Sequence, residues 1–315
     1  MFVPSTPAKA MRESVPSNRR VLSFLADEDL VSLLAERGMG ISSRDVARVA
    51  LQHIGYARLK AYWLPFEQDR SSHKFWPNTT FSRIIEIYDF DRRLRVLMME
   101  AIECIEVSLR AQLGREFAKS YGADGYQDPN IAYNRDKWES AIEMLRAALV
   151  RAGDNVGESS RCDKSVALPP IWTAVESLSL GSMVYWYRHI IPRDVQYSIG
   201  AVYGIHPDIL STWLRHLNIV RNIVAHHGRL WNRAIPFQPK IPNVPALKQS
   251  FNRESTKPYN TLVMLHFLMS AVHSESEWIQ EVMRLIELYQ IRHSAMGFPI
   301  DWEHLPVWQS IESPA

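Results

Sequence analysis

The sequence predicts an all-α protein. Apolar residues recur every three or four positions over long stretches, and no segment shows the strict alternation that a half-buried strand requires. An apolar fraction of 46% with only 13 glycines in 315 residues is typical of a compact globular chain and argues against disorder. We therefore expect helices that pack around one large core or two modest ones.

The N-terminal part of the chain is expected to contain an arm and a small helical hairpin. Residues 1–20 hold Pro, Ser and scattered basic side chains without an apolar run, so we expect a flexible, solvated arm. In the hairpin, residues 21–66, a first helix over residues 27–37 ends before Gly38, and a second helix with a serine cap ends at Ile54. The basic side chains of the arm would add only weak attraction to an anionic polymer.

The larger helical domain, residues 67–315, is built on a central helix over residues 81–121. Its apolar positions recur at helical spacing and are Leu94, Met98, Ala101, Ile105, Leu109, Leu113 and Phe117. Its other face carries Asp89, Asp91, Arg92, Arg95, Glu103, Glu106 and Arg110. We expect Glu103 and Glu106 to pair with arginines between helices, the alternative being that they position Arg221.

Further helices follow at positions that caps and prolines mark. They are predicted over residues 134–151, 169–188, 194–203, 260–272 and 275–289, with a polar loop over residues 152–168. Another helix begins at Pro207 and carries the motif described below. After Trp231 we expect a long Pro-rich loop without regular structure, because five prolines follow at Pro236, Pro239, Pro242, Pro245 and Pro258.

Composition limits the class of protein. Cys104 and Cys162 are the only cysteines, too few for a disulfide framework or a cysteine-rich zinc site. No stretch resembles a signal peptide, and the longest apolar run is too short to cross a bilayer. We therefore expect a cytoplasmic protein without a membrane partner.

The helix from Pro207 presents one apolar and one polar face. On a wheel of about 100° per residue, its polar face gathers Arg215, Asn218, Asn222, His226 and Arg229. Basic residues also dominate here: residues 209–253 contain seven of them and no acid, whereas the whole chain has 36 basic against 34 acidic residues. A local excess of positive charge predicts an anionic partner at this helix.

The residues at the end of this helix suit the cleavage of RNA without a metal. That reaction needs a base for the 2′-hydroxyl proton, an acid for the 5′-oxygen and a fixed positive charge beside the phosphorane. His226 fits the first two roles and Arg221 the third, while the Asn222 amide is placed to orient the imidazole or the phosphate. Arg221 and His226 are five residues apart, about 140° around the helix, so Arg221 is expected at the flank of the polar face. A cleft between two copies would complete the site, which predicts a homodimer.

Other residues near the motif have two possible roles. RNA contacts are expected from Arg215, Asn218, His227, Arg229, Arg233 and Lys240. Arg229 and Arg233 would alternatively satisfy backbone carbonyls, and His226 or His227 would alternatively cap the helix. We favour a core position for Trp231 over base stacking. No carboxylate lies near His216, His226 and His227 in the sequence, so we expect neither a metal nor a cofactor.

Several blocks in order resemble a known family. They are Leu33-Leu34 to Gly38, Ile54-Gly55-Tyr56 with Tyr62 and Pro65-Phe66, Tyr88 to Arg95, Ala101 to Val107, Pro170-Ile171-Trp172, Ser177 to Gly181, Arg221-Asn222 to Asn232-Arg233, and Gly297-Phe298-Pro299. With these blocks the chain resembles the Abi-like phage abortive-infection proteins of bacteria, the AbiD/AbiF group of the HEPN superfamily. That superfamily is marked by Arg, a polar residue, three variable residues and His, which Arg221, Asn222 and His226 match.

The resemblance implies a fold and an activity. The fold would be a HEPN-like helical bundle, and the activity that of a metal-independent endoribonuclease that acts as a dimer. Such proteins serve in phage defence or as toxins, and a small RNA or a protein antitoxin often controls them. Two other functions stay open on the residues alone: a non-catalytic scaffold that holds a cognate small RNA, and a module that binds an acidic protein.

Overall fold

The computed structural model describes residues 25–69, 71–152 and 168–309. In these ranges the regular structure is helical, and only two isolated bridges, Gly40 to Thr80 and Glu67 to Phe75, resemble strand pairing. The all-α prediction is confirmed. The predicted arm, residues 1–20, and nearly all of the predicted polar loop, residues 152–168, lie outside the described residues.

The chain divides into two compact units. Of the described residues, those from 25 to 58 and from 66 to 81 form unit 1, and those from 59 to 65 and from 82 to 309 form unit 2. The division cuts the short helix α3 (Tyr56–Trp63), whose second half belongs to unit 2.

Unit 1 contains the small helical hairpin. Helices α1 (Asp27–Glu36) and α2 (Arg44–Ile54) bury apolar side chains against each other. The Ser43 hydroxyl accepts a hydrogen bond from the N–H of Val46 at 3.4 Å, which makes Ser43 the cap of α2. Gly38 has a φ of +92°, a left-handed conformation that ends α1 where the sequence predicted.

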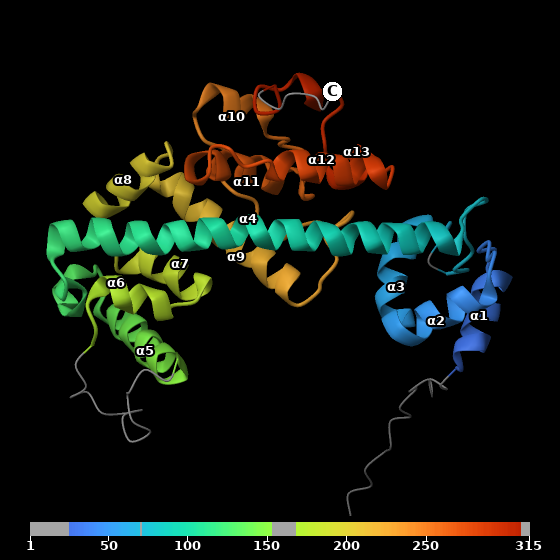
Figure 1. Ribbon diagram of the computed structural model, residues 1–315, viewed down its shortest axis with the longest axis horizontal. Helices are drawn as coiled ribbons and strands as arrows, with labels where there is room; N and C mark the ends of the chain where they lie inside the picture. The colour runs from blue at the N-terminus through green and yellow to red at the C-terminus, as the bar shows by residue number, and fades with distance from the viewer. Residues whose placement is uncertain (1–24, 70, 153–167, 310–315) are drawn as a thin grey trace, which may run out of the picture. The chain divides into compact units, whose positions relative to one another are not determined.

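Unit 2 is organised around α4 (Phe81–Tyr121), whose bounds are those expected from the sequence. In Figure 1 α4 runs across the unit, with α5, α6, α7 and α9 on one side of it and α10 to α13 on the other. All seven of its predicted apolar positions are buried. Placing Asp91 and Arg95 on the opposite face was wrong, because these two residues are 0% and 6% exposed. Asp91 is three residues before Leu94 and seven before Met98, so its side chain lies on the buried stripe itself.

The other helices of unit 2 follow in chain order. They are α5 (Arg135–Ala152), α6 (Ile171–Ala174), α7 (Leu180–His189), α8 (Arg193–Val202), α9 (Pro207–Ala225), α10 (Pro245–Ser250), α11 (Tyr259–Val272), α12 (Trp278–Leu288) and α13 (His293–Met296). Short 3₁₀ turns lie at Leu64–Phe66, Gly125–Gln127, Pro129–Ile131, Val175–Ser177 and Trp302–His304. None of the helices in the described ranges combines the length and the hydrophobicity needed to cross a bilayer.

Two predicted elements need correction. The single helix predicted over residues 169–188 is broken into α6, a 3₁₀ turn and α7, because Ser179 is extended and its hydroxyl accepts from the N–H of Ser182 at 3.2 Å. The Pro-rich stretch is also not wholly irregular. Its Pro245 begins α10, where proline is tolerated because the first turn has no helical acceptor for that N–H.

The C-terminal segment closes over α11. Gly297 has a φ of +89°, and a side-chain carbon there would lie 2.1 Å from the hydroxyl oxygen of Ser255, so the position requires glycine. Its carbonyl accepts from the Asn252 amide at 2.9 Å. The neighbouring Phe298 packs on Tyr259 with ring centroids 4.7 Å apart. These contacts give the Gly297-Phe298-Pro299 block a structural role.

Candidate functional site

The predicted site lies at the C-terminal end of α9. The helix begins where Pro207 occupies the first turn and the His206 ring accepts from the N–H of Asp208 at 3.3 Å. Its buried positions are Pro207, Leu210, Trp213, Leu214, His216, Leu217, Val220 and Val224. This face packs against α7 and α8. On the predicted polar face, Arg215, Asn222 and His226 are exposed, and Asn218 and Arg229 are half-buried.

Three backbone hydrogen bonds end the helix sharply. The N–H of His226 donates to Asn222, that of His227 to Val224 and that of Gly228 to Ile223, at 3.1, 2.9 and 2.7 Å. The last two bonds form a Schellman motif, in which one residue takes a left-handed conformation. Here that residue is His227, with a φ of +55°, in place of the usual glycine.

Gly228 makes this ending possible for a different reason. A side-chain carbon at Gly228 would lie 2.9 Å from the carbonyl oxygen of Ile223 and 3.0 Å from its γ2 carbon. The first distance is shorter than real side-chain carbons show and the second is tighter than most, so a larger residue here would require the backbone at the end of α9 to shift. The glycine after the two histidines therefore fixes the direction in which the chain leaves the helix.

The candidate catalytic residues lie at the C-terminal end of α9, where His226 is the residue that caps the helix. Asn222 and His226 are exposed and Arg221 is half-buried. We expected Arg221 at the flank of the polar face, yet its long side chain turns toward that face: Nη1 donates to the Asn222 side-chain oxygen at 3.4 Å. The guanidinium charge thus lies beside the amide one turn before the imidazole.

Two other predicted RNA contacts lie further up the polar face. Asn218 packs on α7, where a side-chain carbon at Gly181 would lie 3.4 Å from the Asn218 side-chain oxygen. Arg215 is exposed, and its guanidinium lies 4.1 Å from the centre of the Phe237 ring. That distance is typical of a cation–π contact. Both residues therefore already contact other parts of unit 2.

The Pro-rich segment covers the first half of α9. The Lys240 carbonyl accepts from the indole of Trp213 at 2.9 Å, and the Lys240 N–H donates to the Thr212 hydroxyl at 3.1 Å. The Lys240 side chain is exposed. Its backbone is thus fixed to α9 while its ammonium group remains in solvent.

His216, which the sequence grouped with the two motif histidines, is 1% exposed and lies inside unit 2. Its Nδ1 donates to the Phe237 carbonyl at 2.6 Å, because a carbonyl can only accept, and its Nε2 accepts from the Thr261 hydroxyl at 2.8 Å. Burial lowers the pKa of His216 to about 4, so the ring is neutral near pH 7. In the described part of the chain, no three His, Cys, Asp or Glu side chains are grouped so as to hold a metal ion.

A buried carboxylate holds the segment that follows the motif. One oxygen of Asp91, Oδ1, accepts from the N–H groups of Leu230 and Trp231 at 2.9 and 2.5 Å. The other, Oδ2, accepts from the Tyr62 hydroxyl at 2.8 Å and from Arg95. Asp91 was not among the site residues predicted from the sequence, although its spacing from the apolar positions of α4 indicates a buried carboxylate.

Arg229 and Arg233 both bind carbonyl groups. Nη1 of Arg229 donates to the carbonyl of Ala61, and Nη1 of Arg233 donates to that of Arg229 at 3.3 Å. Burial lowers the pKa of the Arg229 guanidinium, and the nearby Asp91 charge opposes that shift. Of the two roles left open for these arginines, carbonyl binding is the one seen here. Trp231 is buried, in line with the expected core position.

Most of this arrangement lies in a region that a known protein family shares. The model of the Abi-like protein family matches residues 49–232, more than half of the chain. The chain belongs to the Abi-like protein family. No curated protein and no solved structure matches the sequence. Membership of this family points to a role in abortive infection.

The region shared with the family contains the candidate catalytic residues of this Abi-like protein. It includes α4 with Asp91 and all of α9, and it ends at Asn232, next to the Trp231 N–H that Asp91 binds. Phe237, Lys240 and the helices from α10 onward lie outside the matched residues. The covering of α9 by the Pro-rich segment is therefore not part of the region that the family model describes.

Of the two glutamates considered in the sequence, Glu106 binds Arg110. Its Oε1 lies 2.5 Å from Nη2 of Arg110 on the same helix, and that nitrogen also donates to the Leu178 carbonyl at 3.0 Å. The pair therefore connects α4 to the turn before α7. Glu103 is exposed.

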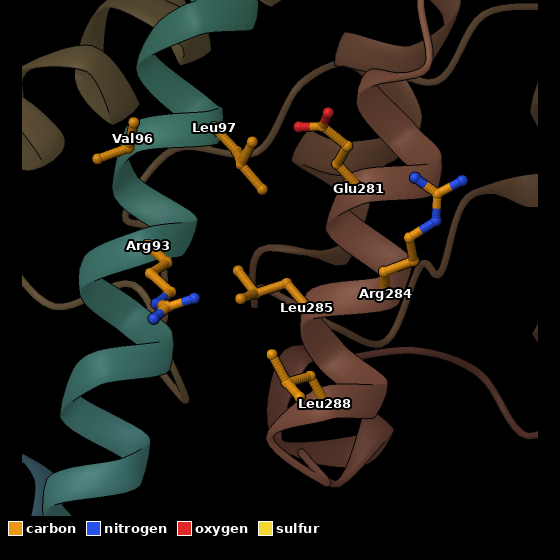
Figure 2. A pocket seen from close by; sticks show the side chains of 7 residues that line it. All are labelled: Arg93, Val96, Leu97, Glu281, Arg284, Leu285 and Leu288. Atoms are coloured by element: carbon orange, nitrogen blue, oxygen red, sulfur yellow. The ribbon is translucent and has the colours of Figure 1, made fainter.

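A separate groove of the Abi-like protein lies between α4 and α12. It has a volume of about 410 Å³ and is lined by Arg93, Val96, Leu97, Glu281, Arg284, Leu285 and Leu288. Figure 2 shows Leu97, Leu285 and Leu288 pointing into the space between the two helices. No predicted site residue lines this groove. Asn222 and His226 are instead exposed at the end of a helix, a position that suits a polymer more than a small enclosed ligand.

Proposed function

We propose that this Abi-like protein is a metal-independent endoribonuclease that acts in abortive infection. The observation that carries the proposal is the last turn of α9, where Arg221 binds the side chain of Asn222 and His226 is exposed just beyond them. An exposed imidazole has access to a substrate, and a guanidinium next to it supplies a fixed positive charge for a phosphate oxygen.

The proposed reaction uses the ribose itself as nucleophile. An imidazole of His226 takes the proton of the 2′-hydroxyl, and the 2′-oxygen attacks phosphorus. The bond from phosphorus to the 5′-oxygen breaks, and that oxygen receives a proton from a second imidazole in its protonated form. Arg221 stabilises the negative charge on the phosphorane. The products are a 2′,3′-cyclic phosphate and a 5′-hydroxyl.

The reaction needs more groups than one helix end offers. One copy supplies one His226 and one Arg221, whereas the mechanism uses one imidazole as base and another as acid. A homodimer with two helix ends facing a shared groove would supply both, and such a contact repeats the same residues on each side. The proposed partners are therefore a second copy of the chain, RNA as substrate, and a small RNA or protein antitoxin as regulator.

Cleavage of RNA in the presence of EDTA, followed by mapping of both new ends, tests the proposal. We expect cutting to persist with chelator, to leave cyclic phosphate ends and to disappear in His226→Ala. Because His226 is exposed and only its backbone N–H bonds to α9, the variant should keep the stability of the wild type. Chelator-sensitive cutting or 3′-hydroxyl ends would refute the mechanism. RNA that is bound and never cut would favour the scaffold function instead.

A further inference from the structure

The two oxygens of the Asp91 carboxylate bind different parts of unit 2. Oδ1 accepts from the backbone of the segment after α9, through the N–H groups of Leu230 and Trp231. Oδ2 accepts from side-chain donors, the Tyr62 hydroxyl and the Arg95 guanidinium. Asp91 has no exposed surface, so these four bonds replace its contact with water. One buried side chain thus joins α3, α4 and the segment that leaves the motif helix.

The segment between His226 and Trp231 is therefore held at both ends. At its start, the N–H groups of His226, His227 and Gly228 bond to the last turn of α9. At its end, Asp91 binds two consecutive N–H groups, and between them Arg229 donates to the Ala61 carbonyl. Only three residues separate His226 from Leu230. So short a segment transmits a movement of Leu230 to the end of α9.

We propose that Asp91 is a positioning residue for His226. The inference rests on the nuclease function proposed above. The last turn of a helix frays unless other contacts hold it, and a catalytic group must keep its geometry within about 0.5 Å. By fixing Leu230 and Trp231, Asp91 holds the turn that ends α9 and with it the exposed imidazole.

Asp91 could also stabilise the fold through its ion pair with Arg95 alone. The test therefore removes this ion pair in both of the variants compared and changes only the acceptor for the Leu230 and Trp231 N–H groups. Replacing a buried ion pair by apolar groups is often tolerated, whereas removing one partner leaves an unpaired charge. Two double variants remove the pair and differ at one position: Asp91→Asn/Arg95→Met and Asp91→Leu/Arg95→Met. The asparagine keeps an acceptor for the Leu230 and Trp231 N–H groups, and the leucine has a similar volume without one.

The first measurement compares kcat and KM for RNA cleavage. We expect Asp91→Leu/Arg95→Met to lose about 100-fold in kcat with little change in KM, and the asparagine variant to recover most of that loss. Tyr62→Phe is the matched control, because it removes one bond to Oδ2 and leaves both bonds to Oδ1 in place. Equal kcat values in the two double variants would overturn the proposal.

The second measurement needs no RNA. Amide hydrogen exchange of Leu230 and Trp231 should be fast in the leucine variant and slow in the asparagine variant, and the NMR signals of the His226 ring should shift only in the former. Slow exchange in both variants would contradict the proposal. If the wild type does not cut RNA, the nuclease function fails, while this exchange and the His226 signals still decide whether Asp91 positions the helix end.

The wild type gives a third measurement should the leucine variant not fold. Native-state exchange in low urea should show the amides of Gly228, Leu230 and Trp231 opening with one shared free energy, since the helix end and the anchored segment would move together. A free energy of opening for the Gly228 amide that is well below that of the Trp231 amide would overturn the proposal.

Discussion

The Nε2 atom of His216 accepts a hydrogen bond from the hydroxyl of Thr261 at 2.8 Å, and Thr261 has no exposed surface. The other ring nitrogen donates to Phe237, so the histidine joins α9, the Pro-rich segment and α11 in its neutral form. Protonation would put a charge in the core and remove the acceptor that Thr261 uses. The stability of the protein should therefore depend on pH through this residue.

We expect His216 to destabilise the protein as the pH falls. Its pKa lies at about 4 in the folded state against 6.5 ordinarily, so the unfolded chain takes up the proton first. Its contribution is complete above pH 6.5 and is lost toward pH 4, a decrease of roughly 3 kcal/mol in the free energy of unfolding. Urea unfolding of the wild type and His216→Gln at several pH values measures it. If the free energy of unfolding falls equally in both proteins between pH 6.5 and pH 4, His216 does not contribute to the pH dependence.

The left-handed backbone of His227 should favour glycine there. His227→Gly and His227→Ala both remove the imidazole, and only alanine keeps the steric cost of a φ near +55°. We expect the glycine variant to be more stable than the alanine variant by about 1 kcal/mol, measured by thermal or urea unfolding. An alanine variant as stable as the glycine variant would mean that the Schellman ending is not maintained.

Arg229 and Lys240 should respond differently to removal. Arg229 binds the Ala61 carbonyl and is partly buried, so Arg229→Met should lower the free energy of unfolding by about 1–3 kcal/mol.

The exposed Lys240 side chain should contribute to RNA binding instead of stability. Lys240→Ala should keep the stability of the wild type. The slope of log affinity for RNA against log salt concentration should become shallower by about one, because one phosphate contact is lost. An unchanged salt slope would remove Lys240 from the RNA surface.

The elements that could be predicted from the sequence are those with an uninterrupted local signal. The bounds of α4 follow from a periodicity that persists over 41 residues, and Pro207 marks the start of α9 in both the sequence and the structure. The break before α7 was missed because Ser179 interrupts a pattern that continues on both sides of it. Local spacing alone does not show whether a serine caps a new helix or lies within one.

The anchored part of the site could not be predicted because its partners are distant along the chain. Leu230 is 139 residues from Asp91, and Arg229 is 168 residues from the Ala61 carbonyl that it binds. The polar pattern of α9 identified the candidate residues at the end of the helix. It did not show which of them bind other parts of the fold. The sequence named both Arg229 and Lys240 as RNA contacts, with carbonyl binding as the alternative for Arg229, and only the fold separates the two.

The central proposal is that RNA is cut at a site built by two copies of the chain. Its most direct test is the activity of wild type after subunit exchange with an equal amount of His226→Ala. If both copies contribute His226 to one site, mixed dimers are inactive and about a quarter of the dimers remain active. The specific activity should then be about a quarter of that of wild-type dimers at the same total protein concentration. A value of about a half, which independent sites would give, would contradict the account.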